Sequence, residues 1–126
     1  MQKFNKILLV DDDEASNFLS SVVISDLDAA KEIETAPDGY VACNMIKQEE
    51  CPDIIFLDIR MPRMDGFDFL DNLRKMGLCE HVKIVMLTSS TRKEEKDRAF
   101  TYKWVVDYFE KPLTEEIVQK VASEYF

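Results

Sequence analysis

Four short apolar segments recur along the chain, at residues 7–10, 54–57, 84–87 and 105–109. The first three contain no polar residue, a pattern typical of strands buried on both faces of a parallel sheet. A weaker segment, Ile33-Glu34-Thr35, alternates in polarity and suits an edge strand better than a central one. We therefore predict five strands, with the second along the chain at an edge of the sheet.

Between these strands, apolar residues recur at intervals of three and four, which places them on one face of a helix. The pattern predicts helices over roughly 14–27, from the Asp38-Gly39 turn to about Glu49, between Gly66 and Gly77, over about 92–102, and after a Thr114 cap. The expected apolar faces are Ala15, Phe18, Leu19, Val22, Val23 and Leu27 in the first helix, Val41, Ala42, Met45 and Ile46 in the second, Phe67, Leu70, Leu73 and Met76 in the third, and Ile117, Val118, Val121, Ala122 and Tyr125 in the last.

The fourth predicted helix differs from the others because it is polar until Ala99 and Phe100 and therefore buries little. Thr91 and Glu94 fit a capping box at its start, in which each side chain bonds a backbone amide of the other's turn. This weakly buried helix is a candidate surface for a partner.

Strands and helices alternate strictly along the chain. Such alternation indicates a parallel sheet with right-handed crossovers and helices on both faces. With the weak second strand at an edge, the expected strand order is 2-1-3-4-5. At 126 residues the chain is expected to be one α/β domain, residues 1–126, with no output domain after the last helix.

The composition narrows the classes of partner. The chain has 25 acidic and 16 basic residues, a net charge of −9 and no basic cluster longer than Arg92-Lys93, which argues against binding to nucleic acid or an anionic membrane. No apolar run approaches the ~18 residues of a membrane span, so we expect a soluble, cytoplasmic protein. The 3 cysteines lack C-x-x-C spacing, which predicts free thiols at Cys43, Cys51 and Cys79.

Polar residues follow the predicted strands at points that meet at one edge of the sheet. Asp11 and Asp12 follow the first strand, Asp58 the third, Thr88 ends the fourth, and Lys111 follows the fifth; in open α/β sheets ligands bind at this edge. Crowded carboxylates need a cation or an ammonium group beside them. Because the candidate ligands are hard oxygens, Mg²⁺ is the expected ion. With the ammonium and the hydroxyl, this set suits phosphoryl transfer to Asp58 as nucleophile.

These residues resemble the receiver domain of two-component response regulators. The matching motifs are Val10-Asp11-Asp12, Leu57-Asp58 with Met61-Pro62 and Met64-Asp65-Gly66, Leu87-Thr88-Ser89 and Lys111-Pro112, in order over about residues 4–125. The resemblance implies a flavodoxin-like (βα)5 fold. It also implies transfer of a phosphoryl group to Asp58 from a phosphohistidine of a sensor histidine kinase or phosphotransfer protein.

The resemblance further implies which groups hold the metal. Mg²⁺ is expected on Asp12, Asp58 and the backbone carbonyl of Arg60, with Asp11 acting mainly through water. Arg60 and Ser90 stand two residues after Asp58 and Thr88, at positions that tune the phosphoryl lifetime in this family.

The same resemblance implies a switch. Thr88 is expected to contact the phosphoryl group and turn toward it, Lys111 to pair with a phosphoryl oxygen, and Tyr108 to reorient. The face of the fourth helix, fifth strand and fifth helix would then bind an unidentified downstream protein. The Lys111–Pro112 bond is expected to be cis. The chain departs from the family at Trp104-Val105, where a Gly-Ala pair is usual.

Two other functions remain compatible with these residues. A phosphorylation-independent adaptor with the receiver fold would bind Mg²⁺ without forming an acyl phosphate. A hydrolase with an aspartyl-phosphate intermediate would need a second acid two residues after the nucleophile, where this chain has Arg60. We therefore expect a phosphoacceptor signalling domain that catalyses only its own phosphorylation and dephosphorylation.

Overall fold

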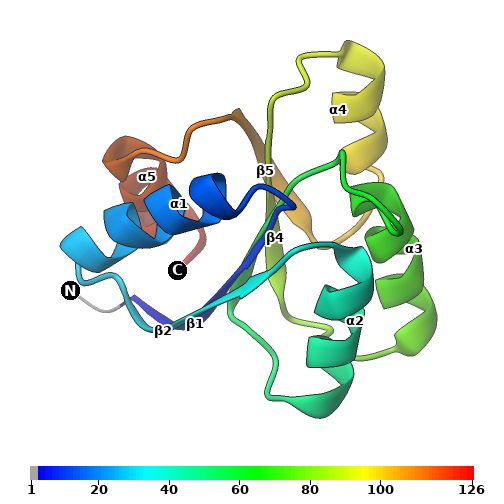
Figure 1. Cartoon of the computed structure of the whole chain (residues 1–126), viewed down its shortest axis with the longest axis horizontal. Coiled ribbons are helices and arrows are strands. Elements are labelled where there is room, and N and C mark those ends of the chain that lie inside the picture. Colours follow the sequence, from blue (N-terminus) through cyan, green and yellow to red (C-terminus); the bar gives the residue numbers. More distant parts are fainter. Residues whose placement is uncertain (1–2) are drawn as a thin grey trace.

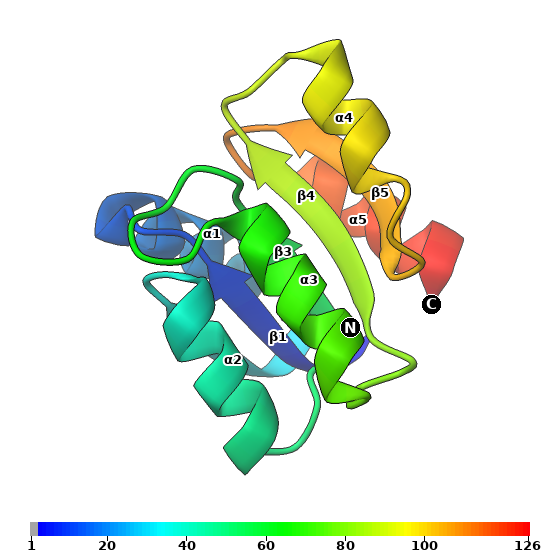
Figure 2. The same ribbon diagram turned by 90° about the vertical axis from the view of Figure 1, so that its right-hand side faces the viewer.

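Five strands and five helices alternate along the chain in a computed structural model that describes residues 3–126. The strands are β1 (Phe4–Val10), β2 (Ala30–Ala36), β3 (Ile54–Leu57), β4 (Lys83–Thr88) and β5 (Val105–Glu110), and the helices are α1 (Glu14–Asp26), α2 (Gly39–Gln48), α3 (Gly66–Met76), α4 (Lys93–Ala99) and α5 (Glu115–Tyr125). α1 and α5 lie on one side of the sheet, and α2 and α3 lie on the other (Figures 1 and 2).

The sheet is parallel throughout, in the order β2-β1-β3-β4-β5, as predicted. In the register of the central pair, Val10 lies opposite Leu57. The backbone N–H of Asp58 donates to the carbonyl of Val10 at 3.0 Å. The residues that follow β1 and β3 therefore leave the sheet side by side.

Two hydrophobic cores fill the space between the sheet and its helices. Successive residues of the central strands point to opposite cores. Leu8, Val10, Ile55 and Leu57 join the core under α2 and α3, whereas Ile7, Leu9, Ile54 and Phe56 join the core under α1 and α5. Burial on both faces explains why these strands are continuous apolar runs in the sequence.

The buried face of α1 matches the predicted apolar face only at Val23 and Leu27, which pack against the core. Phe18 and Leu19 are 67% and 61% exposed, and Val22 is also exposed. The buried residues are instead Asn17, Ser20 and Ile24. Asn17 can be buried because its side-chain amide donates to the carbonyl of Asp11 at 2.9 Å. Hydrophobic spacing cannot anticipate a polar side chain whose hydrogen bond is satisfied by another element.

The start of α4 also differs from the prediction. Its N-cap is Arg92, which makes no side-chain capping bond, so the Thr91–Glu94 capping box is absent. A capping box occurs instead at α3, between Asp65 and Asp68. The predicted cap at Thr114 is confirmed, since its side chain accepts from the N–H of Ile117.

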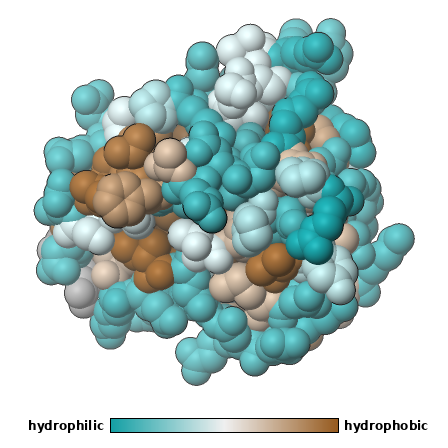
Figure 3. Space-filling view, viewed as in Figure 1, coloured by the Kyte–Doolittle hydropathy of each residue, from teal (hydrophilic) through white to brown (hydrophobic). Residues whose placement is uncertain are grey.

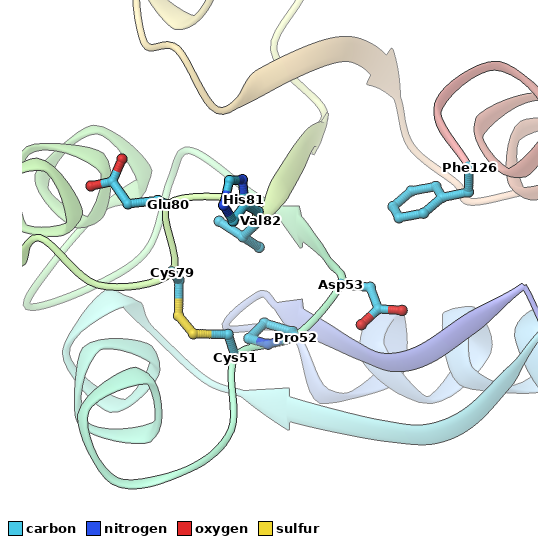
Figure 4. A pocket seen from close by; sticks show the side chains of 8 residues that line it. All are labelled: Cys51, Pro52, Asp53, Cys79, Glu80, His81, Val82 and Phe126. Atoms are coloured by element: carbon cyan, nitrogen blue, oxygen red, sulfur yellow. A yellow bond between two sulfur atoms is a disulfide. The ribbon is translucent and has the colours of Figure 1, made fainter.

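The prediction of free thiols is wrong for two of the three cysteines. Cys51, before β3, and Cys79, before β4, form a disulfide with 5.6 Å between their Cα atoms (Figure 4). Cys43 is a free thiol buried in α2, and burial raises its pKa. Because the paired cysteines are 28 residues apart, only the tertiary fold reveals that they are neighbours.

Candidate functional site

Three carboxylates meet where β1 and β3 end. One oxygen from each of Asp11, Asp12 and Asp58 lies within 4.8 Å of the others. Asp11 and Asp58 are each 5% exposed, whereas Asp12 is exposed to solvent. The structure therefore brings together the three acids that the sequence predicts, with one of them open to solvent.

Lys111 lies between two of these acids. Its Nζ is 2.6 Å from Asp11 Oδ2 and 2.9 Å from Asp58 Oδ2. Burial favours the neutral amine, but the hydrogen bonds to the two carboxylates outweigh burial and raise the pKa of Lys111 above its usual value. Lys111 directly follows β5, and its backbone N–H donates to the carbonyl of Thr88 at 2.9 Å. The Lys111–Pro112 peptide is cis, as the resemblance implies.

The loop after Asp58 is held close to the carboxylates by backbone contacts. Asp58 Oδ1 accepts from the N–H of Ile59 at 2.8 Å, and the N–H of Gly66 donates to the carbonyl of Ile59 at 2.9 Å. A Cβ on Gly66 would lie 2.4 Å from the carbonyl oxygen of Asp58. Only glycine allows α3 to begin this close to the backbone of Asp58.

The same loop is tied to α2. Arg63 donates to Asp38 Oδ2 from Nε at 2.8 Å and from Nη2 at 2.6 Å, while Asp38 Oδ1 caps α2 by accepting from Val41. Burial acts against the charge of Asp38, but the hydrogen bonds from Val41 and Arg63 outweigh it and lower its pKa. Gly39 adds a backbone bond to Met64 at 3.0 Å.

Thr88 and Tyr108 are connected through Ser90. Thr88 is fully buried, and its Oγ1 accepts from the N–H of Ser90 at 3.2 Å. The Tyr108 hydroxyl donates to the carbonyl of Ser90 at 3.1 Å. The two predicted switch residues therefore touch the same loop residue.

Sequence reasoning missed the role of Glu95 in α4. Arg60 Nη2 donates to both carboxylate oxygens of Glu95, at 3.1 and 3.0 Å, and the Ser90 hydroxyl donates to the same carboxylate. The bond from Ser90 outweighs burial and, together with Arg60, lowers the pKa of Glu95. The sequence signal that could have predicted this ion pair is a basic residue at position 60 together with an acidic residue in the first turn of the fourth helix.

A separate hollow of about 470 Å³ lies at the opposite end of the sheet (Figure 4). It is lined by the disulfide, by residues 52–53 and 80–82, and by Phe126. Apart from Phe126, which follows α5, these residues precede β3 and β4, whereas Asp58 follows β3. The hollow is therefore not continuous with the carboxylate cluster.

The sequence profile of the response regulator receiver domain matches residues 7–122. The chain belongs to this family. The five parallel strands in the order 2-1-3-4-5 are the flavodoxin-like fold of this receiver domain.

Among curated relatives, a protein-glutamate methylesterase/protein-glutamine glutaminase of Burkholderia pseudomallei is 40% identical over 93 residues, which is 74% of this chain and 24% of the relative. A similar protein of Methylobacillus flagellatus is 36% identical over 70% of this chain and 24% of its own length. The receiver thus spans about a quarter of the length of these relatives.

Solved structures of response regulators have the same fold. A two-component response regulator from Cytophaga hutchinsonii superimposes with a TM-score of 0.88 at 28% identity, covering 98% of this chain and 97% of that one. The chemotaxis protein CheY4 of Vibrio cholerae gives 0.82 at 29% identity, covering 97% and 98%. The response regulator domain of Thermotoga maritima CheB gives 0.72 at 26% identity, covering 95% and 89%.

The carboxylate cluster of the receiver fits a divalent cation. The donor set consists of carboxylate oxygens, and one acid, Asp12, is open to solvent, which leaves room for the water ligands that Mg²⁺ retains. Within residues 3–126, no helix is both long and apolar enough to cross a membrane.

Proposed function

We propose that this receiver accepts a phosphoryl group on Asp58 from a phosphohistidine of a sensor histidine kinase or phosphotransfer protein. The observation that carries the proposal is the cluster of two buried carboxylates and one exposed carboxylate, with a lysine between the two buried ones. An Asp58 carboxylate oxygen would attack phosphorus, the P–N bond to the donor histidine would break, and the leaving imidazole nitrogen would keep the bonding electron pair. The product is an acyl phosphate on Asp58.

The surrounding groups have separate tasks in this proposal. Asp11, Asp12, Asp58 and the backbone carbonyl of Arg60 would hold Mg²⁺, with Asp11 acting mainly through water. When bound, the ion would supply positive charge against the oxygens of the transferring group. Lys111, already between Asp11 and Asp58, would turn to a phosphoryl oxygen.

Signal output is proposed to run through Thr88 and Tyr108. A phosphoryl group that draws the Thr88 hydroxyl inward would break the hydrogen bond between Thr88 Oγ1 and the N–H of Ser90. The carbonyl of Ser90 also accepts the hydrogen bond from the Tyr108 hydroxyl. Movement of this loop would favour a different arrangement of α4, β5 and α5 and so change affinity for a downstream protein. The receiver acts here as a signalling domain.

The exposed apolar face of α1 is proposed to meet the phosphodonor protein. Phe18, Leu19 and Val22 form this α1 patch, and hydrophobic surface gathers over α1 in Figure 3. Leu19 also lines a hollow of about 180 Å³ with Lys111 and Pro112. A protein that delivers a phosphoryl group to Asp58 must cover the rim beside Lys111, and the patch continues from that rim.

The decisive test is the intact mass of the protein after acetyl phosphate, with and without Mg²⁺. We expect one phosphoryl adduct in the wild type with Mg²⁺, and none in Asp58→Asn or after chelation with EDTA. Circular dichroism checks that the variant is folded. An adduct that persists in Asp58→Asn would identify another nucleophile. No adduct in a folded wild type, with no acetyl phosphate consumed, would favour the phosphorylation-independent adaptor.

A further inference from the structure

The guanidinium of Arg60 is close to the proposed phosphoryl site in sequence but is bound elsewhere. Arg60 follows Asp58 by two residues, yet its Nη2 binds both oxygens of Glu95 in α4. The Arg60 side chain is 61% exposed and the Glu95 side chain 17% exposed. The exposed Arg60 side chain can therefore change its position in solvent, whereas the Glu95 side chain is more buried and more restricted.

Glu95 is fixed from a second side. The Ser90 hydroxyl donates to it, the N–H of Ser90 donates to Thr88 Oγ1, and the Ser90 carbonyl accepts from Tyr108. Burial raises the pKa of Tyr108, the charges of Glu95 and Asp58 raise it further, and the Ser90 bond and Arg60 oppose them. One carboxylate on α4 is thus coupled to both residues proposed to switch.

The site gains negative charge when a phosphoryl group arrives. Its ammonium group, on Lys111, is already divided between Asp11 and Asp58. A guanidinium binds phosphoryl oxygens and carboxylates with the same forked geometry, and the more highly charged phosphoryl group competes well for it. Arg60 is the cation whose present partner can be replaced at little cost, because an exposed ion pair contributes little to stability.

We propose that Glu95 is a positioning residue that withholds Arg60 from the phosphoryl site, and that Arg60 leaves Glu95 for the phosphoryl oxygens during phosphorylation. The inference rests on the proposed function of Asp58 and names a regulator of that same site. Loss of Arg60 leaves Glu95 bound only to the Ser90 hydroxyl. Phosphorylation would therefore remove an ion pair from Glu95 in the first turn of α4. This change in α4 does not require Tyr108 to move.

The test measures phosphorylation by acetyl phosphate, at saturating Mg²⁺, as a function of donor concentration in four variants. In Glu95→Gln, a released Arg60 attracts the anionic donor, so we expect the half-saturating concentration to fall about threefold to tenfold with the maximal rate unchanged. Glu94→Gln is the matched control, because Glu94 is a neighbouring exposed acid in the same helical turn. It removes the same charge and should behave as the wild type.

Arg60 supplies the second half of the test. Arg60→Ala and Arg60→Ala/Glu95→Gln should have the same half-saturating concentration, because Glu95 acts only through Arg60. An unchanged Glu95→Gln, an equal effect of Glu94→Gln, or an effect that persists without Arg60 would each overturn the inference while leaving phosphorylation of Asp58 intact. No adduct in the wild type would overturn the proposed function and, with it, the inference.

Discussion

At the residue scale, pairs of opposite charge lie in and beside the carboxylate cluster of the receiver. Lys111 bridges Asp11 and Asp58, and Arg63 binds Asp38 at the start of α2. The Arg63–Asp38 pair makes no contact with Asp58. It fixes the loop that carries Arg60, so its effect on the site is one of placement.

Asp38 provides a prediction about stability and pH. Asp38→Ala removes a helix cap and an ion pair and should lower the free energy of unfolding by about 1–2 kcal/mol, measured by urea denaturation at neutral pH. Asp38→Asn retains a capping oxygen and should cost less, about 0.2–1 kcal/mol for the loss of the ion pair with the exposed Arg63.

The difference between wild type and Asp38→Asn should depend on pH in a defined direction. The pKa of Asp38 in the folded protein is lowered from its ordinary value of 3.8, so ionised Asp38 stabilises the fold at all pH values above 3.8. This contribution is lost as the pH falls through the lowered pKa. Urea midpoints of the two proteins should therefore converge in strong acid. A constant difference down to low pH would show that the charge of Asp38 is not responsible.

At the element scale, sequence patterns predict what a strand buries better than what a helix exposes. The runs at Ile7, Ile54 and Ile84 have no polar interruption because both faces of β1, β3 and β4 are buried. In α1 the apolar spacing predicts that Phe18 is buried, whereas the structure buries Asn17. The side chain of Asn17 donates a hydrogen bond to the carbonyl of Asp11, which lies outside the helix. Local spacing also predicts the buried faces of α2, α3 and α5 correctly, whereas the buried face of α1 depends on its tertiary partner.

The exposed α1 patch leads to a prediction about the phosphodonor. Phe18→Ser should reduce phosphotransfer from a sensor histidine kinase that phosphorylates the wild type by about tenfold, as expected when an aromatic residue central to an interface is removed. The rate with acetyl phosphate should stay unchanged, because this small donor needs no protein surface. Phosphotransfer is followed by the transfer of radioactive phosphate.

Leu78→Ser is the control for this substitution. Leu78 is 41% exposed and lies between α3 and β4, at the far end of the sheet from Asp58. It removes a similar apolar side chain from solvent without touching the patch. Equal losses in both variants, or a loss with acetyl phosphate as well, would remove α1 from the docking surface.

At the scale of the whole molecule, the two ends of the sheet have different properties. The carboxyl ends of the strands carry the charged site, and the amino ends carry the disulfide that links the segments before β3 and β4. The proximity of Asp11, Asp12, Asp58 and Lys111 was predictable because each residue follows a recognisable strand. The Cys51–Cys79 pair was not, because neither residue has a local pattern that reports its distance from the other.

The disulfide gives the last prediction. It closes a loop spanning 28 positions that contains β3, Asp58 and α3. Closing a loop of this size lowers the conformational entropy of the unfolded chain and so stabilises the fold by about 2–4 kcal/mol.

Cys51→Ser should therefore lower the free energy of urea unfolding by about that amount in the absence of reductant. With dithiothreitol, which reduces the disulfide to two thiols, the wild type should fall to the same stability. Cys43 is unpaired in the wild type, so the reductant breaks no bond there. Phosphorylation by acetyl phosphate should be equal for both folded forms, because the bond lies at the end of the sheet away from Asp58. If the wild type is equally stable with and without reductant, the disulfide does not contribute to folding.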